Sequence, residues 1–188
     1  MSRSPDPTIA FSTWLADARR GEAAGFAGLY DWLGPEVKRF VVGRGARDAD
    51  AITNDAFVAA FRRLGDFDGD AAAFRSWVYS IARNKLIDAH RSDQRRPPVA
   101  GDQPAIDLAP AASAEDLVLD GLGHERAAEL LACLSEAQQD VILLRVVNGL
   151  SLAETADAVR RPVSAVKRLQ ARGLAALRKK ISDEGVSP

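Results

Sequence analysis

The sequence predicts an all-α protein made of two small helical domains that are joined by a flexible linker. Ala, Leu, Arg and Glu are abundant among the 188 residues, and no segment alternates apolar and polar residues for long, as a half-buried strand would. Apolar residues recur at helical spacing on both sides of residues 92–114. This central segment lacks such a pattern and contains four prolines, which is typical of a mobile connection.

The first domain is predicted to span residues 8–91 and to begin with two or three helices over residues 8–43. Thr8 is a candidate N-cap for the first helix, because a Thr side chain accepts a hydrogen bond from a free backbone N–H of the first turn. Pro35 follows Gly34 and removes a backbone donor, so we expect a break there before the helical pattern resumes.

Two further helices complete the first domain. Residues 48–64 place their apolar side chains on one stripe, as in a half-buried helix. An Asp- and Gly-rich loop follows at residues 65–70, and the next helix is predicted over residues 71–91. Trp77 shares the spacing of the apolar residues in that helix and is expected in the core. Residues 92–114 form the linker.

The second domain is predicted to span residues 115–182. Ser135 and Ser151 each start a capping-box pattern, and Gly149 between them is a helix stop. The helix that Ser151 opens is short. After a tight connection, Ser164 is expected to cap a last, longer helix.

The formal net charge of −1, taken alone, argues against a nucleic-acid partner. The charges are nevertheless segregated along the chain. Residues 151–180 carry +6 and residues 75–96 carry +4, whereas residues 115–140 carry −6. Clustered Lys and Arg is the pattern that phosphate contacts require, although a solvated helix face produces similar counts. The near-neutral total is therefore a cancellation that leaves a nucleic-acid partner open.

The last helix has the charge pattern of a DNA-recognition helix. Val166 is at the centre of its apolar face, and the opposite face is basic. A short capped helix and a tight connection precede it, as in a helix-turn-helix, whose second helix enters the major groove by its N-terminal residues. The candidates for base edges are Ser164, Ala165, Lys167 and Arg168. The candidates for phosphates lie further along and are Arg172, Arg178 and Lys179. A helical hairpin without DNA is the alternative.

Other chemistries find no support in the sequence. One Cys and two His cannot form a disulfide framework or a usual zinc site, so no metal or cofactor is expected. No Gly-rich phosphate loop, Ser-His-Asp set or HExxH motif is present, and the Asp-rich loop lacks EF-hand spacing, so an enzyme is not expected. Cys133 lies in an apolar run and is expected to be a buried, inert thiol.

The expected localisation depends on the length of the apolar runs in the sequence. The longest apolar runs have about four or five residues, far short of the ~18 that a membrane span needs. The N-terminal stretch lacks the apolar region and cleavage site of a signal peptide. A cytoplasmic protein without membrane insertion is therefore expected.

Specific motifs in the two halves resemble one known family. The first half contains NDAF at residues 54–57 and FRSWVYSIARNKLID at residues 74–88, and the second pairs GLSLAETA at 149–156 with AVKRLQ at 165–170. With their order and spacing, these motifs resemble regions 2 and 4 of an extracytoplasmic-function (ECF, group IV) RNA polymerase sigma factor. The resemblance covers about residues 22–181.

The resemblance implies an alternative sigma factor that directs promoter-specific transcription initiation and is not an enzyme. Region 2 of such proteins binds the β′ clamp helices of core RNA polymerase and captures the non-template strand of the −10 element. Region 4 binds the β flap tip and reads the −35 element of promoter DNA. The family is usually held inactive by an anti-sigma factor. The alternative is a small helix-turn-helix transcription regulator that acts without polymerase docking, which leaves the motifs of the first half unexplained.

Individual residues inherit roles from this resemblance. The residues matching the polymerase-binding helix are Asn54, Asp55, Phe57 and Phe61, with core packing as the alternative for the two Phe. Phe67 and Asp68 match the loop that holds a flipped −10 base, with a solvated turn as the alternative. The polar positions of the following helix that match −10 contacts are Arg83, Asn84, Lys85, Asp88 and Arg91.

Three departures from the family pattern limit what is carried over. Gln is commoner in the family where Asn54 stands, and Gly is commoner where Arg160 stands. The recognition helix begins SAVKRLQ rather than the commoner GTVKSR. The −35 sequence preference, the regulon and the inducing signal are therefore not predicted, nor is the arrangement of the two domains in the free protein.

Overall fold

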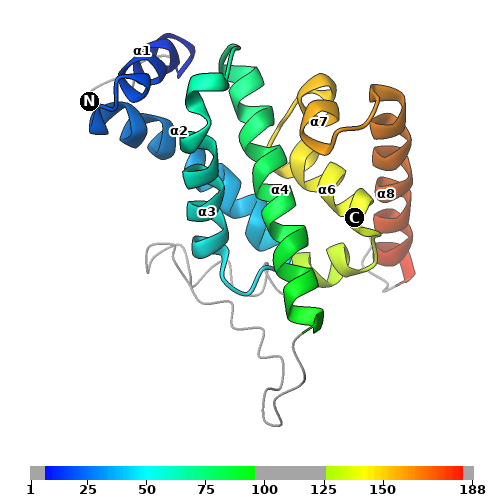
Figure 1. Ribbon diagram of the computed structural model, residues 1–188. Helices are drawn as coiled ribbons and strands as arrows, with labels where there is room; N and C mark the ends of the chain where they lie inside the picture. Colours follow the sequence, from blue (N-terminus) through cyan, green and yellow to red (C-terminus); the bar gives the residue numbers. More distant parts are fainter. Residues whose placement is uncertain (1–6, 96–125, 184–188) are drawn as a thin grey trace, which may run out of the picture.

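The computed structural model describes residues 7–95 and 126–183, and the regular structure in these ranges is entirely helical. The first range contains α1 (Pro7–Arg19), α2 (Ala23–Gly43), α3 (Ala49–Arg62), the 3-10 turn η1 (Leu64–Asp66) and α4 (Ala71–Arg95). The second begins with helical residues 126–132 and continues with α6 (Glu136–Ile142), the π-helix η2 (Leu143–Val147), α7 (Leu152–Val159) and α8 (Val163–Asp183) (Figure 1). The all-α prediction is confirmed. Most of the predicted linker and the start of the predicted second domain lie outside the described residues.

Pro35 does not break the helix, contrary to the prediction, and α2 continues through it to Gly43. Two local features reduce the cost of an internal proline. Gly34 has no Cβ to clash with the proline ring, and apolar side chains before and after it, such as Leu33 and Val37, are completely buried. Burial on both sides of Pro35 thus outweighs the lost backbone hydrogen bond.

The predicted capping boxes are confirmed. At α7, the Glu154 backbone N–H donates to Ser151 Oγ at 3.1 Å, and the Ser151 N–H donates to Glu154 Oε2 at 2.7 Å. At α6, the Ser135 N–H donates to Gln138 Oε1 at 2.9 Å. Each pair satisfies backbone donors that the first turn of a helix leaves free.

Two other helix starts differ from the prediction by a residue or more. α1 begins at Pro7, so Thr8 lies inside the first turn rather than at the cap. Proline suits this first position because its missing N–H would have had no partner there. α8 begins at Val163, and the Pro162 carbonyl accepts from the Ala165 N–H at 2.9 Å, so Ser164 does not cap the helix either.

The helix that begins at Glu136 changes register before it ends. Residues Leu143–Val147 form a π-helix, which the sequence did not predict. Its end is fixed by Asn148, whose backbone N–H and side-chain Nδ2 both donate to the Leu143 carbonyl, at 2.9 and 3.1 Å. Gly149 then adopts a φ of +67°, which agrees with its predicted role as a helix stop.

The prediction that Cys133 is buried was wrong, because its side chain is exposed. It lies in the turn between residues 126–132 and the Ser135 cap, where the helix has ended and the apolar spacing no longer places side chains in the core. Within the described ranges, no helix is long and apolar enough to cross a membrane.

The two groups of helices pack against each other through α4. In Figure 1, α4 runs through the middle of the molecule, with α3 on one side and α6 and α7 on the other, and α7 packs directly on α4. One apolar cluster extends across both groups, from Phe40 of α2 and Val78 of α4 to Leu143 and Leu150 of the second domain. A Cβ at Gly43 would lie 2.6 Å from Leu143 Cδ2, so the domains meet closely at this point.

Arg160 joins α7 to α8 in the left-handed conformation, with a φ of 53°. It is the single non-glycine residue with positive φ in the part of the chain that the structure describes. Glycine commonly occupies such a left-handed position at the end of a helix, because any other side chain is strained there when its Cβ approaches the following carbonyl.

Arg160→Gly is expected to raise the free energy of unfolding by about 0.5–1 kcal/mol, since relief of the left-handed strain exceeds the entropy that glycine adds to the unfolded chain. Thermal unfolding followed by circular dichroism measures the change. Arg161→Gly is the matched control, because this neighbouring exposed Arg has no positive φ. A loss of stability in Arg160→Gly equal to that in the control would contradict the strain argument.

Candidate promoter and polymerase interfaces

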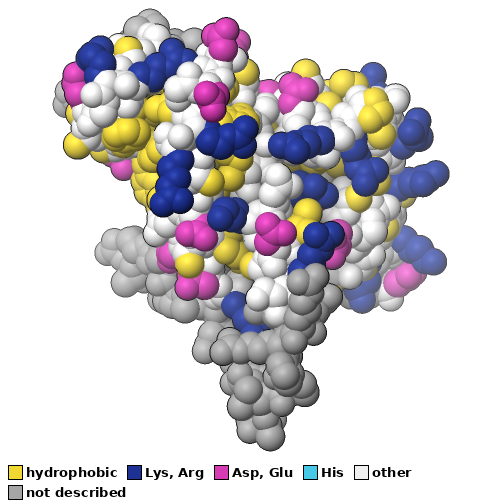
Figure 2. All heavy atoms as spheres, in the orientation of Figure 1, with side chains coloured by type: hydrophobic (Ala, Val, Ile, Leu, Met, Phe, Trp, Pro, Cys, Tyr) yellow, Lys and Arg dark blue, Asp and Glu magenta, His cyan; other side chains and the backbone are white. Residues whose placement is uncertain are grey.

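The basic face of α8 is open to solvent. Val166 and Gly173 are buried against the rest of the second domain, and the opposite face carries Arg and Lys along the edge of the molecule formed by α8 (Figure 2). The predicted −35 contacts that are exposed are Ser164, Lys167, Arg168, Arg172, Arg178 and Lys179, while Ala165 is half-buried. The N-terminal turns of α8 therefore present polar and basic groups together, as a helix that enters a major groove requires.

The loop between η1 and α4 is fixed at both ends, and its tip is exposed. The Phe67 ring is buried, stacked on Trp77 at 5.1 Å between centroids and edge-on to Phe74 at 5.4 Å. Asp70 Oδ1 accepts from the Ala73 N–H at 2.8 Å and caps α4. Asp68 between them is exposed. In this conformation Asp68 is available to a base, whereas Phe67 supports the loop from within the core.

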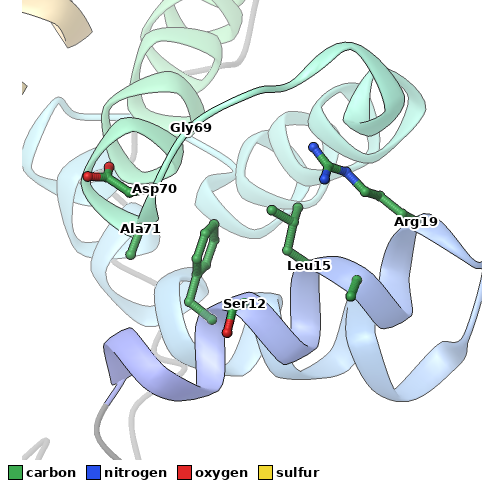
Figure 3. A pocket seen from close by; sticks show the side chains of 8 residues that line it. Ser12, Leu15, Arg19, Gly69, Asp70 and Ala71 are labelled. Atoms are coloured by element: carbon green, nitrogen blue, oxygen red, sulfur yellow. The ribbon is translucent and has the colours of Figure 1, made fainter.

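A cavity of about 350 Å³ lies between α1 and this loop (Figure 3). Figure 3 shows Ser12, Leu15 and Arg19 of α1 on one side and Gly69–Ala71 on the other. The Arg19 guanidinium also donates a hydrogen bond to the Phe67 carbonyl. α1 thus contacts the loop directly, a contribution that the sequence did not indicate.

Some polar residues of α4 are exposed, and others contact charged residues elsewhere in the protein. Asn84, Asp88 and Arg91 are exposed. Lys85 Nζ lies 3.7 Å from Asp55 Oδ2 of α3, and the Arg83 guanidinium donates to Asp140 of the second domain at 2.6 Å. Two candidate −10 residues are therefore occupied by contacts inside the protein.

The predicted polymerase-binding residues of α3 are not all on one surface. Asn54 and Asp55 are exposed, and Asn54 Oδ1 accepts from the Tyr30 hydroxyl at 2.9 Å. Phe57 is 2% exposed and packs in the core, and Phe61 is half-buried next to it. Val58 is 46% exposed beside the polar pair and is a candidate that the prediction omitted. The sequence could have indicated Val58, because this residue falls outside the apolar stripe of the helix.

A polar network between the domains was also missed by the sequence prediction. Asp140 Oδ1 lies 2.7 Å from Arg44 Nε, and its Oδ2 accepts from Arg83. Arg75 donates to Glu36 at 2.8 Å and to the Asn148 carbonyl. The pKa of the Tyr79 phenol is raised, mainly because the group is buried. The negative charge of Glu36 raises this pKa further, while Arg75 and Arg39 lower it.

Two family models match the chain: Sigma-70 region 2 over residues 29–96 and Sigma-70, region 4 over residues 130–179. A chain that carries these two regions in this order is a sigma factor of the sigma-70 type. The ECF RNA polymerase sigma factor SigX of Bacillus subtilis is 30% identical over 161 residues, which cover 80% of each chain. The chain therefore belongs to the ECF family of RNA polymerase sigma factors, which confirms the resemblance seen in the motifs.

Two further similarities support this assignment. The ECF sigma factor BldN of Streptomyces coelicolor is 32% identical over 169 residues, which cover 89% of this chain and 64% of BldN. CnrH is an RNA polymerase sigma factor of Cupriavidus metallidurans. The solved structure of CnrH in complex with the cytosolic domain of CnrY matches with a TM-score of 0.70 and 25% identity, covering 95% of this chain and 99% of the other.

Proposed function

We propose that this chain is an alternative sigma factor that joins core RNA polymerase and selects promoters by their −10 and −35 elements. The observation that carries the proposal is the exposed basic face of α8, set behind a short capped helix in a chain that also holds the region 2 motifs. A helix-turn-helix alone fits many regulators, but region 2 in the same chain fits a polymerase subunit.

The two promoter elements are assigned to different elements of the fold. The −35 element is read by the N-terminal turns of α8, with Arg168 as the residue best suited to a guanine and Lys179 suited to a phosphate. The −10 element is read by Asp68 at the loop tip and by the exposed polar face of α4, which carries Asn84 and Arg91. An acidic loop tip suits the amino groups of a flipped base better than it suits phosphates.

Polymerase contact is assigned to the exposed face of α3. Asn54 and Asp55 supply polar groups, and Val58 supplies an exposed apolar contact at the centre of this face. An apolar side chain framed by polar groups is the usual composition of a protein interface centre and rim. We also propose an anti-sigma factor as partner, as the resemblance to the family implies. CnrH was solved in complex with another protein, the cytosolic domain of CnrY.

The assignment is tested by mixing the purified chain with core RNA polymerase and promoter DNA. Formation of a stoichiometric complex and run-off transcription from a defined start site is the expected result. Binding of the chain alone to palindromic DNA, without any complex with core polymerase, would instead support a regulator of the helix-turn-helix class.

Val58→Glu is expected to weaken binding to core polymerase by at least about tenfold, because a charge replaces an apolar contact in the proposed interface. Binding is measured by fluorescence anisotropy without promoter DNA. Val163→Glu is the matched control, since Val163 is 40% exposed but belongs to the second domain. Both variants should retain their melting temperature. Equal binding by the two variants would show that this face of α3 does not belong to the interface.

A further inference from the structure

Asp140 is placed where a single carboxylate contacts two arginines of the other domain. Its Oδ2 accepts a hydrogen bond from Arg83 Nε of α4 at 2.6 Å, and its Oδ1 lies 2.7 Å from Arg44 Nε at the end of α2, in ionic contact without hydrogen-bond alignment. The side chains of Asp140 and Arg44 are 2% and 4% exposed. This is a buried ion triad, in which loss of one member leaves the others charged and desolvated.

A second contact lies two turns earlier on the same face of α4. Arg75 Nη2 donates to the Asn148 carbonyl, and its Nη1 lies 3.7 Å from Glu154 Oε1 at the start of α7. Arg75 is also held by Glu36 of its own domain. Arg75 and Arg83 lie eight residues apart on α4, a little over two turns, and both contact the second domain. The arginine face (Arg44, Arg75 and Arg83) thus meets acidic and carbonyl groups of the second domain.

We infer that the arginine face is a docking surface for polyanionic groups, and that in the free protein its occupant is the chain's own second domain. The carboxylate of Asp140 takes the place that a nucleic-acid phosphate takes when the domains separate. This part of the inference rests on the proposed function, because Arg83 is one of the candidate −10 contacts. Arg44, which no comparison or motif assigned, joins it as a second phosphate ligand.

The closed arrangement withholds the arginine face, which is part of the −10 surface, and leaves the −35 surface open. Arg83 is 23% exposed and faces Asp140, whereas Asn84 and Arg91 of α4 remain exposed. Arg168 and Arg172 of α8 are exposed as well. A ligand that needs the open state binds with an affinity reduced by the fraction of molecules that are open. The free chain therefore binds −10 DNA weakly until a partner that prefers the open state increases the fraction of open molecules.

Domain closure is measured directly with spin labels. Cys133 is the one cysteine in the sequence and is exposed, so it accepts one label, and Asp31→Cys on the exposed face of α2 accepts the other. The expected result is a narrow distance distribution in the otherwise unchanged chain and a broad, longer one after Asp140→Asn, which keeps the size of the side chain. Glu136→Gln is the matched control, because Glu136 is 76% exposed and 4.0 Å from Arg44, and it should leave the distribution narrow. A broad distribution before substitution, or a narrow one in Asp140→Asn, would overturn the closed state.

The exchange with DNA is measured by anisotropy with a single-stranded oligonucleotide carrying the non-template −10 sequence. Asp140→Asn is expected to bind at least tenfold more tightly than the unsubstituted chain, a difference of about 1.4 kcal/mol. Arg83→Gln should also separate the domains but should not bind the oligonucleotide more tightly, since it removes an arginine that contacts DNA as well as the ion pair with Asp140. If the domains of Asp140→Asn separate but its affinity for DNA is unchanged, phosphates do not dock on the arginine face. That result would overturn this part of the inference, while the closed state of the free chain would still hold. Circular dichroism shows that each variant keeps its helix content.

Discussion

Phe74→Ala is expected to lower the free energy of unfolding by about 3–5 kcal/mol. Phe74 is completely buried at the start of α4 and contacts four aromatic rings, those of Phe11, Trp32, Phe67 and Trp77, with centroids 5.4–6.3 Å away. Alanine would remove the shared partner of these rings and leave a cavity that helices from three directions cannot close.

The loss is measured by urea unfolding followed by tryptophan fluorescence, with Phe26→Ala as the control. Phe26 is half-buried and contacts one ring, Phe61, at 4.9 Å, so its truncation should cost much less. Because Phe67 is held by Phe74, the variant should also discriminate less between −10 sequences in holoenzyme. Equal losses in the two variants would show that the cluster around Phe74 is not the centre of the core.

Arg168→Ala and Lys179→Ala are expected to affect promoter binding in different ways. Arg168 is exposed in the second turn of α8, where a recognition helix meets base edges, so its loss should cost about 1–3 kcal/mol at one −35 base pair and relax the preference there. Lys179 is exposed three turns later, so its loss should weaken binding to all sequences alike and reduce the salt slope by about one.

Both effects are measured by titrating holoenzyme with promoters that vary in the −35 element, over a range of salt concentrations. Each variant controls for the other, because each removes one positive charge from the same helix. A uniform loss in both, with unchanged base preference, would show that the N-terminal turns of α8 do not enter the major groove.

The parts of this fold that depend on neighbouring residues were predicted well. The capping boxes at Ser135 and Ser151 and the helix stop at Gly149 involve groups within a few residues of each other, so the sequence contains the whole interaction. The break expected at Pro35 was wrong for the opposite reason. Whether a helix passes through a proline depends on the burial of residues on either side, which is set by distant elements.

The candidate site divides in the same way. The amphipathic pattern of α8 was sufficient to separate its buried and basic faces. Asp140 was counted only as one charge of an acidic segment, because its partner Arg83 is 57 residues away and no local pattern marks the pair. The tight pairing of Phe67 with Trp77 was equally hidden, since aromatic residues ten positions apart on a loop and a helix have no fixed relation in sequence.

The contact between α1 and the loop bears on where the working unit of region 2 begins. The family match starts at residue 29, after α1 has ended, yet Arg19 holds the Phe67 carbonyl and Phe11 packs on Trp32 and Phe74. The segment that the family model matches therefore depends on a support that lies outside the match. Exchange of region 2 between relatives at the family boundary would separate the loop from this support, so chimeric sigma factors are better joined ahead of α1.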